Sequence, residues 1–268
     1  MPTKLTEKKT LKKKTDIFSD EEVTLMLYQM TKDISEMFGK FNIQYWADGG
    51  TFLGAIRHKG IIPWDDDVDV GTLLSNKKKI TSVAFKKFLT QNGYQLLEVD
   101  YGFKIFPING MKIKMNPWAA HIDEFKENNP TIKARNEIYS KAAKTYNKPK
   151  GPVYYQYKYP FVDIFLYRRV EDKLMTMDLS KWYSNKCYYL YSNLNKLKKQ
   201  QFGGFKISIM PDGNRYFTNC YGSDWNINGY VTWDHKNEKF MKDRRKIKLQ
   251  KKHRVPAEPF GPLKNNIK

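Results

Sequence analysis

The stretch that decides the fold runs from Tyr45 to Val70 and reads YWADGGTFLGAIRHKGIIPWDDDVDV. It places a glycine pair, Gly49-Gly50, ahead of an acidic cluster. Apolar residues over 41–47 predict a strand before the glycines, and residues 52–57 follow with a short helical pattern. A strand, a glycine turn and a helix in this order allow backbone N–H groups to approach an anion closely.

The acidic cluster has the spacing of a strand. Asp65, Asp67 and Asp69 occupy alternate positions, and Val68 and Val70 lie between and after them. Alternate residues of a strand share one face, so Asp67 and Asp69 are expected about 7 Å apart. Two like charges this close favour a divalent cation between them, and oxygen ligands suit Mg²⁺ or Mn²⁺ better than Zn²⁺. The simpler alternative is a solvated acidic turn beside a glycine hairpin.

A second informative stretch is YPFVDIFL, residues 159–166. Asp163 stands there among large apolar residues, and a carboxylate buried in such surroundings needs a counter-charge or hydrogen bonds. The residues alone leave open whether Asp163 binds a metal or only hydrogen-bonds the backbone.

The order of strand, Gly-Gly turn, helix and Asp-hydrophobic-Asp strand resembles polymerase-β-type nucleotidyltransferases. Within that superfamily the sequence resembles the LicD/fukutin family, whose signature is close to DGGTLLGAxRHxGxIPWDDDxD. The positions that fit are Asp48, Gly49, Gly50, Thr51, Leu53, Gly54, Ala55, Arg57, His58, Gly60, Ile62, Pro63, Trp64, Asp65, Asp66, Asp67 and Asp69. The FVDIF segment and a later YGSDW segment also resemble the family, so the likeness runs from about Tyr45 to Trp233.

The resemblance implies an α+β (α/β) fold, in which a polymerase-β-like core has a mixed sheet flanked by helices and carries a family-specific insertion. It also implies that Asp67, Asp69 and Asp163 bind Mg²⁺ or Mn²⁺, with Asp163 on a neighbouring strand. Asp65 is then an outer-shell ligand or the base that accepts the proton of an acceptor hydroxyl. The expected donor-binding residues are Gly49, Gly50, Thr51, Arg57, His58 and Lys104. A structural Arg57 and a surface Lys104 are the alternatives at those two positions.

The activity implied by the resemblance is transfer of a phospho-alcohol from a CDP-linked donor, such as CDP-choline or CDP-ribitol, to a hydroxyl of a glycan or glycoconjugate. The same metal cradle would serve a nucleotidyltransferase that attacks an NTP and releases pyrophosphate. The residues do not separate these two reactions.

The formal net charge of +20 raises a third hypothesis, a nucleic-acid-binding protein with a degenerate catalytic domain. Residues 1–14 and 242–254 supply +12 of that charge, so the body between them is only mildly basic. We therefore predict a basic arm over residues 1–15, one LicD-like domain over 16–241 and a basic tail over 242–268. Nucleic-acid binding through these ends is possible but not favoured.

Periodicity and turn residues predict the remaining elements. We expect helices over 19–39, with Ser19 as N-cap, over 76–92 and near 131–146, strands over 94–99 and 102–108, and a helical, aromatic-rich region over 177–199. Cys187 and Cys220 lack metal-site spacing and are expected as free thiols, with a single disulfide as the alternative. The sequence has no apolar run long enough to span a membrane and no signal-like N-terminus, which predicts a cytoplasmic protein.

Overall fold

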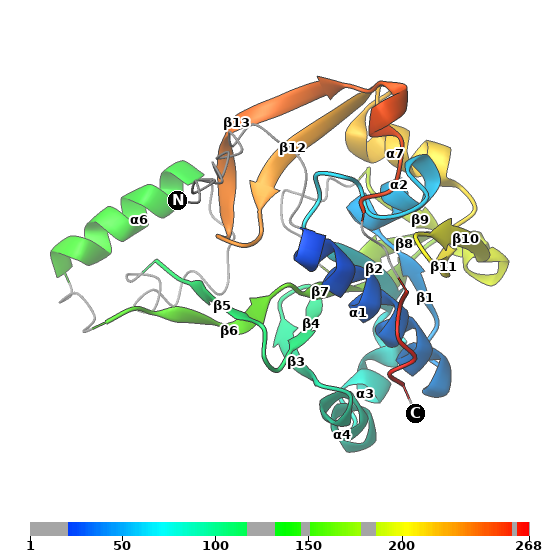
Figure 1. Ribbon diagram of the computed structural model, residues 1–268, viewed down its shortest axis with the longest axis horizontal. Coiled ribbons are helices and arrows are strands. Elements are labelled where there is room, and N and C mark those ends of the chain that lie inside the picture. Colours follow the sequence, from blue (N-terminus) through cyan, green and yellow to red (C-terminus); the bar gives the residue numbers. More distant parts are fainter. Residues whose placement is uncertain (1–20, 117–131, 146–150, 178–185, 259–261, 268) are drawn as a thin grey trace, which may run out of the picture.

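The computed structural model describes residues 21–116, 132–145, 151–177, 186–258 and 262–267 (Figure 1). The arm predicted over residues 1–15 and the cap predicted at Ser19 lie outside these residues. The described part is a mixed α+β structure with one large sheet, helices packed around it and three two-stranded ribbons. The predicted α+β class with a mixed sheet is therefore confirmed, whereas the polymerase-β-like core stays an expectation.

The large sheet provides the frame for the candidate site. Its main path runs β1 (Tyr45–Ala47), β2 (Val68–Leu73), β7 (Val162–Val170), β4 (Gly102–Pro107), β3 (Tyr94–Val99). The β2–β7 pair is parallel, and the other pairs along this path are antiparallel. Two short strands, β8 (Lys173–Thr176) and β9 (Tyr189–Leu190), extend the sheet at the C-terminal end of β7. There β8 pairs with β7, and β9 pairs with β8.

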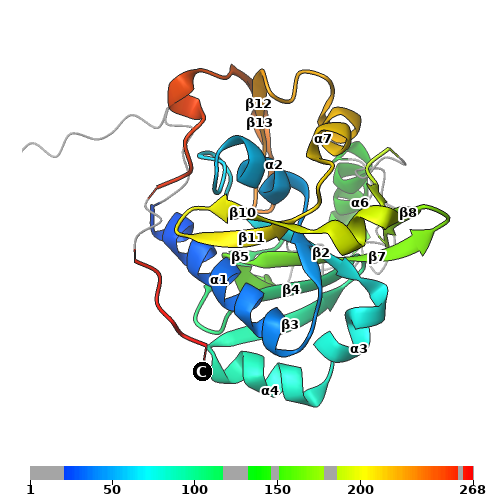
Figure 2. The ribbon, with the colours of Figure 1, turned by 90° about the vertical axis from the view of Figure 1, so that its right-hand side faces the viewer.

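Helix α1 (Glu21–Lys40) packs against β7 and against β11 (Phe205–Ile209) (Figure 2). Its buried apolar positions follow the helical period that the sequence predicted, because one stripe of side chains faces the core. These positions are Val23, Leu27, Met30, Ile34, Met37 and Phe38. The predicted strand over 41–47 is shortened to β1, since the chain turns after α1 with Asn42 at a φ of 51°.

The remaining helices are α2 (Gly49–Arg57), α3 (Lys77–Ile80), α4 (Val83–Gln91), α6 (Ile132–Thr145) and α7 (Gly213–Tyr221). The single helix predicted over 76–92 is wrong, because the chain breaks between α3 and α4. Ser82 has extended backbone angles, and its hydroxyl accepts a bond from the N–H of Phe85, so it starts α4 as an N-cap. The helix predicted near 131–146 is confirmed by α6.

The region predicted as helical over 177–199 is the clearest error. Where the structure describes it, the chain forms β9, the 3₁₀ helix η3 (Tyr191–Lys196) and the start of β10 (Lys198–Phe202), which pairs with β11. Tyr189 lies in the core and stacks on Tyr216 of α7 with ring centroids 4.3 Å apart. Burial of these aromatic rings outweighs the helical pattern.

The boundary predicted at residue 242 falls inside a strand. The β12 (Asn228–Asp234) and β13 (Lys239–Lys248) strands form an antiparallel hairpin, drawn in orange in Figure 1. The third ribbon pairs β5 (Met111–Lys114) with β6 (Tyr154–Tyr159). High charge therefore does not separate residues 242–248 from the folded body, because β-pairing is made by the backbone.

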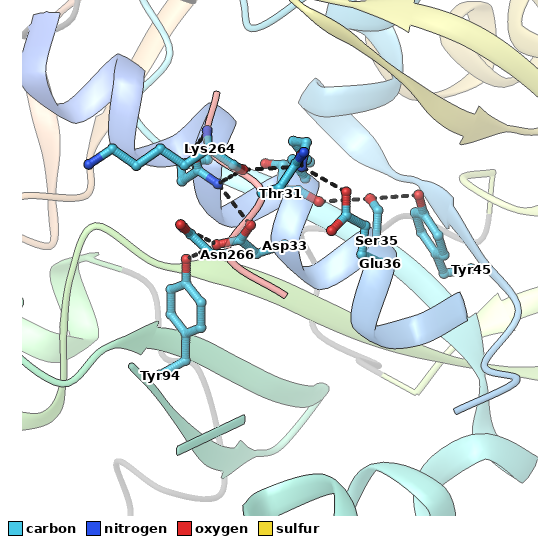
Figure 3. Close-up of polar contacts among 11 residues, drawn as sticks. Thr31, Asp33, Ser35, Glu36, Tyr45, Tyr94, Lys264 and Asn266 are labelled. Carbon is cyan, nitrogen blue, oxygen red and sulfur yellow. Dashed lines mark hydrogen bonds and ion pairs between the residues drawn. The ribbon is translucent and has the colours of Figure 1, made fainter. Parts of the chain in front are cut away.

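Beyond β13 and the short helix η4 (Lys251–His253), the chain returns to α1. Buried Ala257 donates its N–H to the carbonyl of Ile61 at 2.8 Å, and its carbonyl accepts the hydroxyl of Tyr28 at 3.1 Å. Figure 3 shows Asn266 and Tyr94 directed at Asp33 of α1, with bonds of 3.1 and 2.7 Å. The segment predicted as a basic tail is thus largely part of the body.

Cys187 and Cys220 form a disulfide, with Cα atoms 5.1 Å apart. The expectation of free thiols is therefore wrong, and the alternative that the sequence left open is the one found. Cys220 lies on α7 and Cys187 precedes β9, so the bond joins two segments that the sequence pattern did not bring together. Within the described residues, no helix is both long and apolar enough to cross a membrane.

Candidate metal centre

Strand register brings the three predicted carboxylates together. In the parallel β2–β7 pair Asp69 lies opposite Asp163, and in the antiparallel β4–β7 pair Asp163 lies opposite Lys104. Residues directly opposite each other in a sheet share a face. Asp67 comes immediately before β2, not within a strand as predicted, yet oxygens of Asp67, Asp69 and Asp163 all lie within 4.8 Å of one another.

Asp163 has two partners besides the neighbouring carboxylates. The Nζ of Lys104 lies 2.8 Å from Oδ1 and 2.9 Å from Oδ2, and the hydroxyl of Tyr101 donates to Oδ1 at 2.6 Å. Lys104 is 7% exposed, and its ammonium lies 3.6 Å from the ring centroid of Phe161. The surface alternative for Lys104 is therefore wrong, and its predicted contact with a phosphate stays a prediction.

Burial and mutual repulsion disfavour the charged forms of the clustered carboxylates. Burial raises the pKa of Asp67 to about 6, with the nearby Asp66 and Asp163 carboxylates acting in the same direction against His235. Burial and the adjacent Asp67 raise the pKa values of both Asp65 and Asp69 well above the usual range. A cation among these oxygens would remove the repulsion.

Helix α2 begins next to the cluster and is anchored by Asp48. This residue caps α2 by accepting the N–H of Gly49 at 2.8 Å. It is completely buried, and its carboxylate also accepts three hydroxyls, from Tyr167 and Tyr189 at 2.6 Å and from Tyr216 at 3.1 Å. The aspartate of the DGGT motif therefore fixes the start of α2 within the core.

The other residues of the glycine turn connect α2 to the acidic strand. The Thr51 hydroxyl accepts the backbone N–H of Asp69 at 2.7 Å, so it holds β2 against α2. A Cβ on Gly50 would lie 3.0 Å from the Oδ2 of Asp65, and glycine allows this close approach. The first N–H groups of a helix have no partner within it. The turn thus places the N-terminus of α2 beside Asp65 and Asp69. The binding of donor phosphates by Gly49, Gly50 and Thr51 stays a prediction.

Arg57 and His58 are held by protein contacts near the end of α2, and their predicted contacts with a donor phosphate stay predictions. Arg57 Nη1 donates to the carbonyls of Trp225 and, at 3.2 Å, Asn228. His58 is fully buried with its ring perpendicular to that of Trp64, and burial lowers its pKa to about 3. Arg57 therefore joins the end of α2 to Trp225 and to the first residue of β12. His58 packs against Trp64, and the structure does not bring it to the carboxylates.

The turn of the β12–β13 hairpin contacts the acidic cluster through His235, a residue that the sequence did not indicate as part of the site. His235 Nδ1 lies 2.6 Å from Asp66 Oδ1, and Nε2 lies 3.1 Å from Asp67 Oδ2. Burial lowers the pKa of His235, but the Asp67 and Asp66 carboxylates outweigh it and raise the value to about 10. Glu238 of the same turn accepts the hydroxyl of Tyr157 at 2.8 Å. Nothing in the local pattern around residue 235 indicates this contact.

The donor set fits a divalent cation. Asp67, Asp69 and Asp163 offer only oxygen atoms, the ligands that Mg²⁺ and Mn²⁺ prefer, and repulsion from neighbouring carboxylates raises the pKa values of Asp67 and Asp69. The zinc alternative would need cysteine or several histidine ligands, and the described cysteines are joined to each other.

A family profile described as LicD/FKTN/FKRP, nucleotidyltransferase domain, matches residues 42–148. This range includes the glycine turn and the acidic strand of the candidate centre. The chain belongs to the LicD/fukutin family. Asp163 and His235 lie beyond the matched residues.

The individual relatives agree with this assignment. An uncharacterized protein of Rickettsia typhi is 28% identical over 253 residues, which are 92% of this chain and 63% of that protein. The lipopolysaccharide cholinephosphotransferase LicD of Haemophilus influenzae is 46% identical over 48 residues, 18% of each chain. Human ribitol 5-phosphate transferase FKRP is 56% identical over 34 residues, 13% of this chain and 7% of its own. The chain thus spans less than two thirds of the length of these relatives.

Proposed function

We propose that this chain is a divalent-cation-dependent phosphotransferase that moves a phospho-alcohol, such as phosphocholine or ribitol phosphate, from a CDP-linked donor to a hydroxyl of a glycan or glycoconjugate. The observation that carries the proposal is the Asp67–Asp69–Asp163 cluster, with oxygens within 4.8 Å of one another. The names of the Haemophilus and human relatives support the class of group transferred.

The proposal assigns the residues of the centre to cation binding, phosphate binding or proton acceptance. The three carboxylates would hold Mg²⁺ or Mn²⁺, which supplies positive charge to the phosphate oxygens of the donor. The N-terminus of α2, with Gly50 and Thr51, would contribute N–H groups and the positive end of the helix dipole to the same phosphates. Asp65, whose pKa is raised by burial, is the candidate base for the acceptor hydroxyl.

Of the predicted donor ligands, Lys104 keeps a phosphate contact in this proposal, whereas Arg57 and His58 have structural roles. Lys104 neutralises Asp163 before the cation binds, and its ammonium then becomes available to a phosphate. Arg57 would have to leave the carbonyls of Trp225 and Asn228 to reach a phosphate, so we assign it to holding that segment. His58 has a packing role.

The decisive experiment is calorimetry of the protein with CDP-choline, CDP-ribitol, CDP-glycerol, CTP and ATP, each with Mg²⁺ and with EDTA. We expect one CDP-alcohol to bind only in the presence of Mg²⁺, and CMP to be released when an acceptor glycan is added. Binding of CTP or ATP with release of pyrophosphate, and no binding of a CDP-alcohol, would replace this function by the nucleotidyltransferase alternative.

The variant Asp69→Asn tests the cluster itself. The amide keeps the shape of the carboxylate but removes charge that holds the cation, so turnover should fall by about 10²-fold or more. The melting temperature in EDTA should stay the same or rise, because one repelling charge is gone. Asp172→Asn, at an exposed position in the turn after β7, is the matched control and should change neither quantity. A large loss of melting temperature in EDTA would instead make Asp69 a structural residue.

A further inference from the structure

The β12–β13 hairpin brings a histidine to the acidic cluster from a distant part of the sequence. Asp234 pairs with Lys239 at the end of the hairpin, so His235 is the first residue of the turn. The Asp234 carboxylate accepts the N–H of Asn237 at 3.0 Å, which gives the turn a fixed local form. His235 and its partner Asp66 are 169 positions apart.

The imidazole of His235 is held in one orientation. Its Nδ1 lies 2.6 Å from Asp66 Oδ1, and its backbone N–H donates to Asp66 Oδ2 at 3.1 Å. The ring also meets the ring of Phe161 edge-on, with centroids 5.8 Å apart and an interplanar angle of 82°. These contacts leave Nε2 directed at Asp67, whose Oδ2 is 3.1 Å away.

This arrangement matches the one that orients metal-bound histidines. In such sites one ring nitrogen binds the metal, and the other donates its proton to a carboxylate that fixes the tautomer. Two ligands on adjacent corners of an octahedron, with bonds of about 2.1 Å, lie about 3 Å apart. The separation of His235 Nε2 and Asp67 Oδ2 has this value, and Asp66 occupies the position of the orienting carboxylate.

Asp67 also links the histidine to the three-carboxylate cluster. It belongs to two groups of ligand atoms that lie within 4.8 Å of one another, one with Asp69 and Asp163 and one with Asp66 and His235. A cation on Asp67 is therefore within reach of an imidazole nitrogen as well as of carboxylate oxygens.

We propose that His235 is a nitrogen ligand of the cation centre and that Asp66 is its positioning residue. The inference rests on the proposed function only in taking the carboxylate cluster as a cation site. Mg²⁺ keeps oxygen ligands and water, whereas imidazole favours first-row transition cations. His235 should consequently shift the preference of the centre from Mg²⁺ toward Mn²⁺.

The competing interpretation is that His235 is an imidazolium that only balances the charge of Asp66 and Asp67. The two interpretations predict opposite effects of its removal. Loss of a ligand weakens cation binding, and mainly that of Mn²⁺. Loss of a positive charge next to the carboxylates strengthens the binding of Mn²⁺ and Mg²⁺ alike.

The experiment titrates the full chain with Mn²⁺, without any nucleotide, and follows free Mn²⁺ by electron paramagnetic resonance. Pulsed measurements on the bound Mn²⁺ then detect coupling to a ligand nitrogen, and ¹⁵N-labelling of histidine identifies its source. We expect histidine nitrogen coupling in the wild-type protein. In His235→Gln this coupling should disappear, and Mn²⁺ affinity should fall by about 10-fold or more, with a smaller change for Mg²⁺ measured by competition.

Two further variants define the role of Asp66 and the control. Asp66→Asn should keep the nitrogen coupling but lower Mn²⁺ affinity by about 10-fold, because the ring loses its orienting partner. Lys236→Ala, exposed in the same turn, should change nothing. Absence of nitrogen coupling in the wild-type spectrum overturns the inference even if a variant does not fold.

The outcomes separate this inference from the proposed function. Bound Mn²⁺ without nitrogen coupling, or higher affinity in His235→Gln, would overturn the role of His235 and leave an oxygen-only centre for the transferase. Absence of any Mn²⁺ binding would overturn both.

Discussion

The buried pair of Lys104 and Asp163 offers the sharpest test of how the carboxylate cluster is held together. The ammonium lies within 3 Å of both carboxylate oxygens, and the two side chains are only 9% and 8% exposed. Lys104→Met keeps most of the volume between Phe161 and Tyr157 but removes the charge. Asp163 would then remain buried among other carboxylates without its nearest cation.

The expected decrease in the free energy of unfolding follows from the removal of the Lys104 charge. Removing one partner of a buried ion pair costs about 3–5 kcal/mol, because the other charge stays desolvated and unpaired. We expect this loss of unfolding free energy in EDTA. A divalent cation on Asp163 replaces the missing charge, so the loss should shrink to about 1–2 kcal/mol in saturating Mg²⁺. Because saturating cation stabilises each protein according to its own dissociation constant, the loss shrinks only if the variant, whose Asp163 is unpaired, binds Mg²⁺ more tightly than wild type. A reduction of about 2–3 kcal/mol corresponds to roughly 30- to 150-fold in that constant.

The assay is urea unfolding of both proteins, in EDTA and in excess Mg²⁺. Lys112→Met is the matched control, since Lys112 is exposed on β5 and its ammonium lies 5.6 Å from the ring centroid of Tyr154. It should change the free energy of unfolding by less than about 0.5 kcal/mol. A loss below 1 kcal/mol for Lys104→Met in EDTA, or an equal loss in EDTA and Mg²⁺, would refute the reasoning.

Three further predictions address the surrounding structure. Asp48→Ala leaves three buried tyrosine hydroxyls without their acceptor, so the free energy of unfolding should fall by about 3 kcal/mol or more; a loss under 1 kcal/mol in urea would contradict this. Because burial lowers the pKa of His58 from 6.5 to about 3, the unfolded chain binds a proton there that the folded chain does not. Stability is therefore lost as pH falls below 6.5, by about 3 kcal/mol at pH 4 from this group. His58→Gln should flatten that decline in urea titrations from pH 7 to 4, and an unchanged slope would exclude the mechanism. Cys187→Ser opens a disulfide between positions 33 apart and should cost about 2–4 kcal/mol, whereas two titratable thiols in the unreduced wild type would show that the bond is absent.

The glycine turn and the acidic strand were predictable because their signals are local. A strand, a capped helix and alternate aspartates are each encoded within a few residues, and the structure places them in that order as β1, α2 and β2. The family resemblance added Asp163, and the β2–β7 register then brought it opposite Asp69. Periodicity alone contains no information about which strands become neighbours.

The errors have a common physical origin in contacts between distant segments. Tyr189 lies in the core against Tyr216. The aromatic residues around it are therefore explained by burial in the core and do not indicate a helix. The charge of residues 242–248 suggested a free tail, but their backbone pairs with β12. In each case the local composition was compatible with two structures, and a partner far along the chain selected one of them.

Contacts between distant segments also set the shortest stretch of chain that could form the proposed centre. The family match over residues 42–148 contains Asp67 and Asp69 but neither Asp163, which supplies the third carboxylate, nor His235. Without β7, the β2 strand would lose its parallel partner, and β4 would lose the strand that separates Lys104 from Asp69. The matched range therefore carries the signature of the family without its complete site. The proposed cation ligands extend to the turn at His235, so we predict that a fragment ending at residue 148 binds Mn²⁺ far more weakly than the full chain in the same titration.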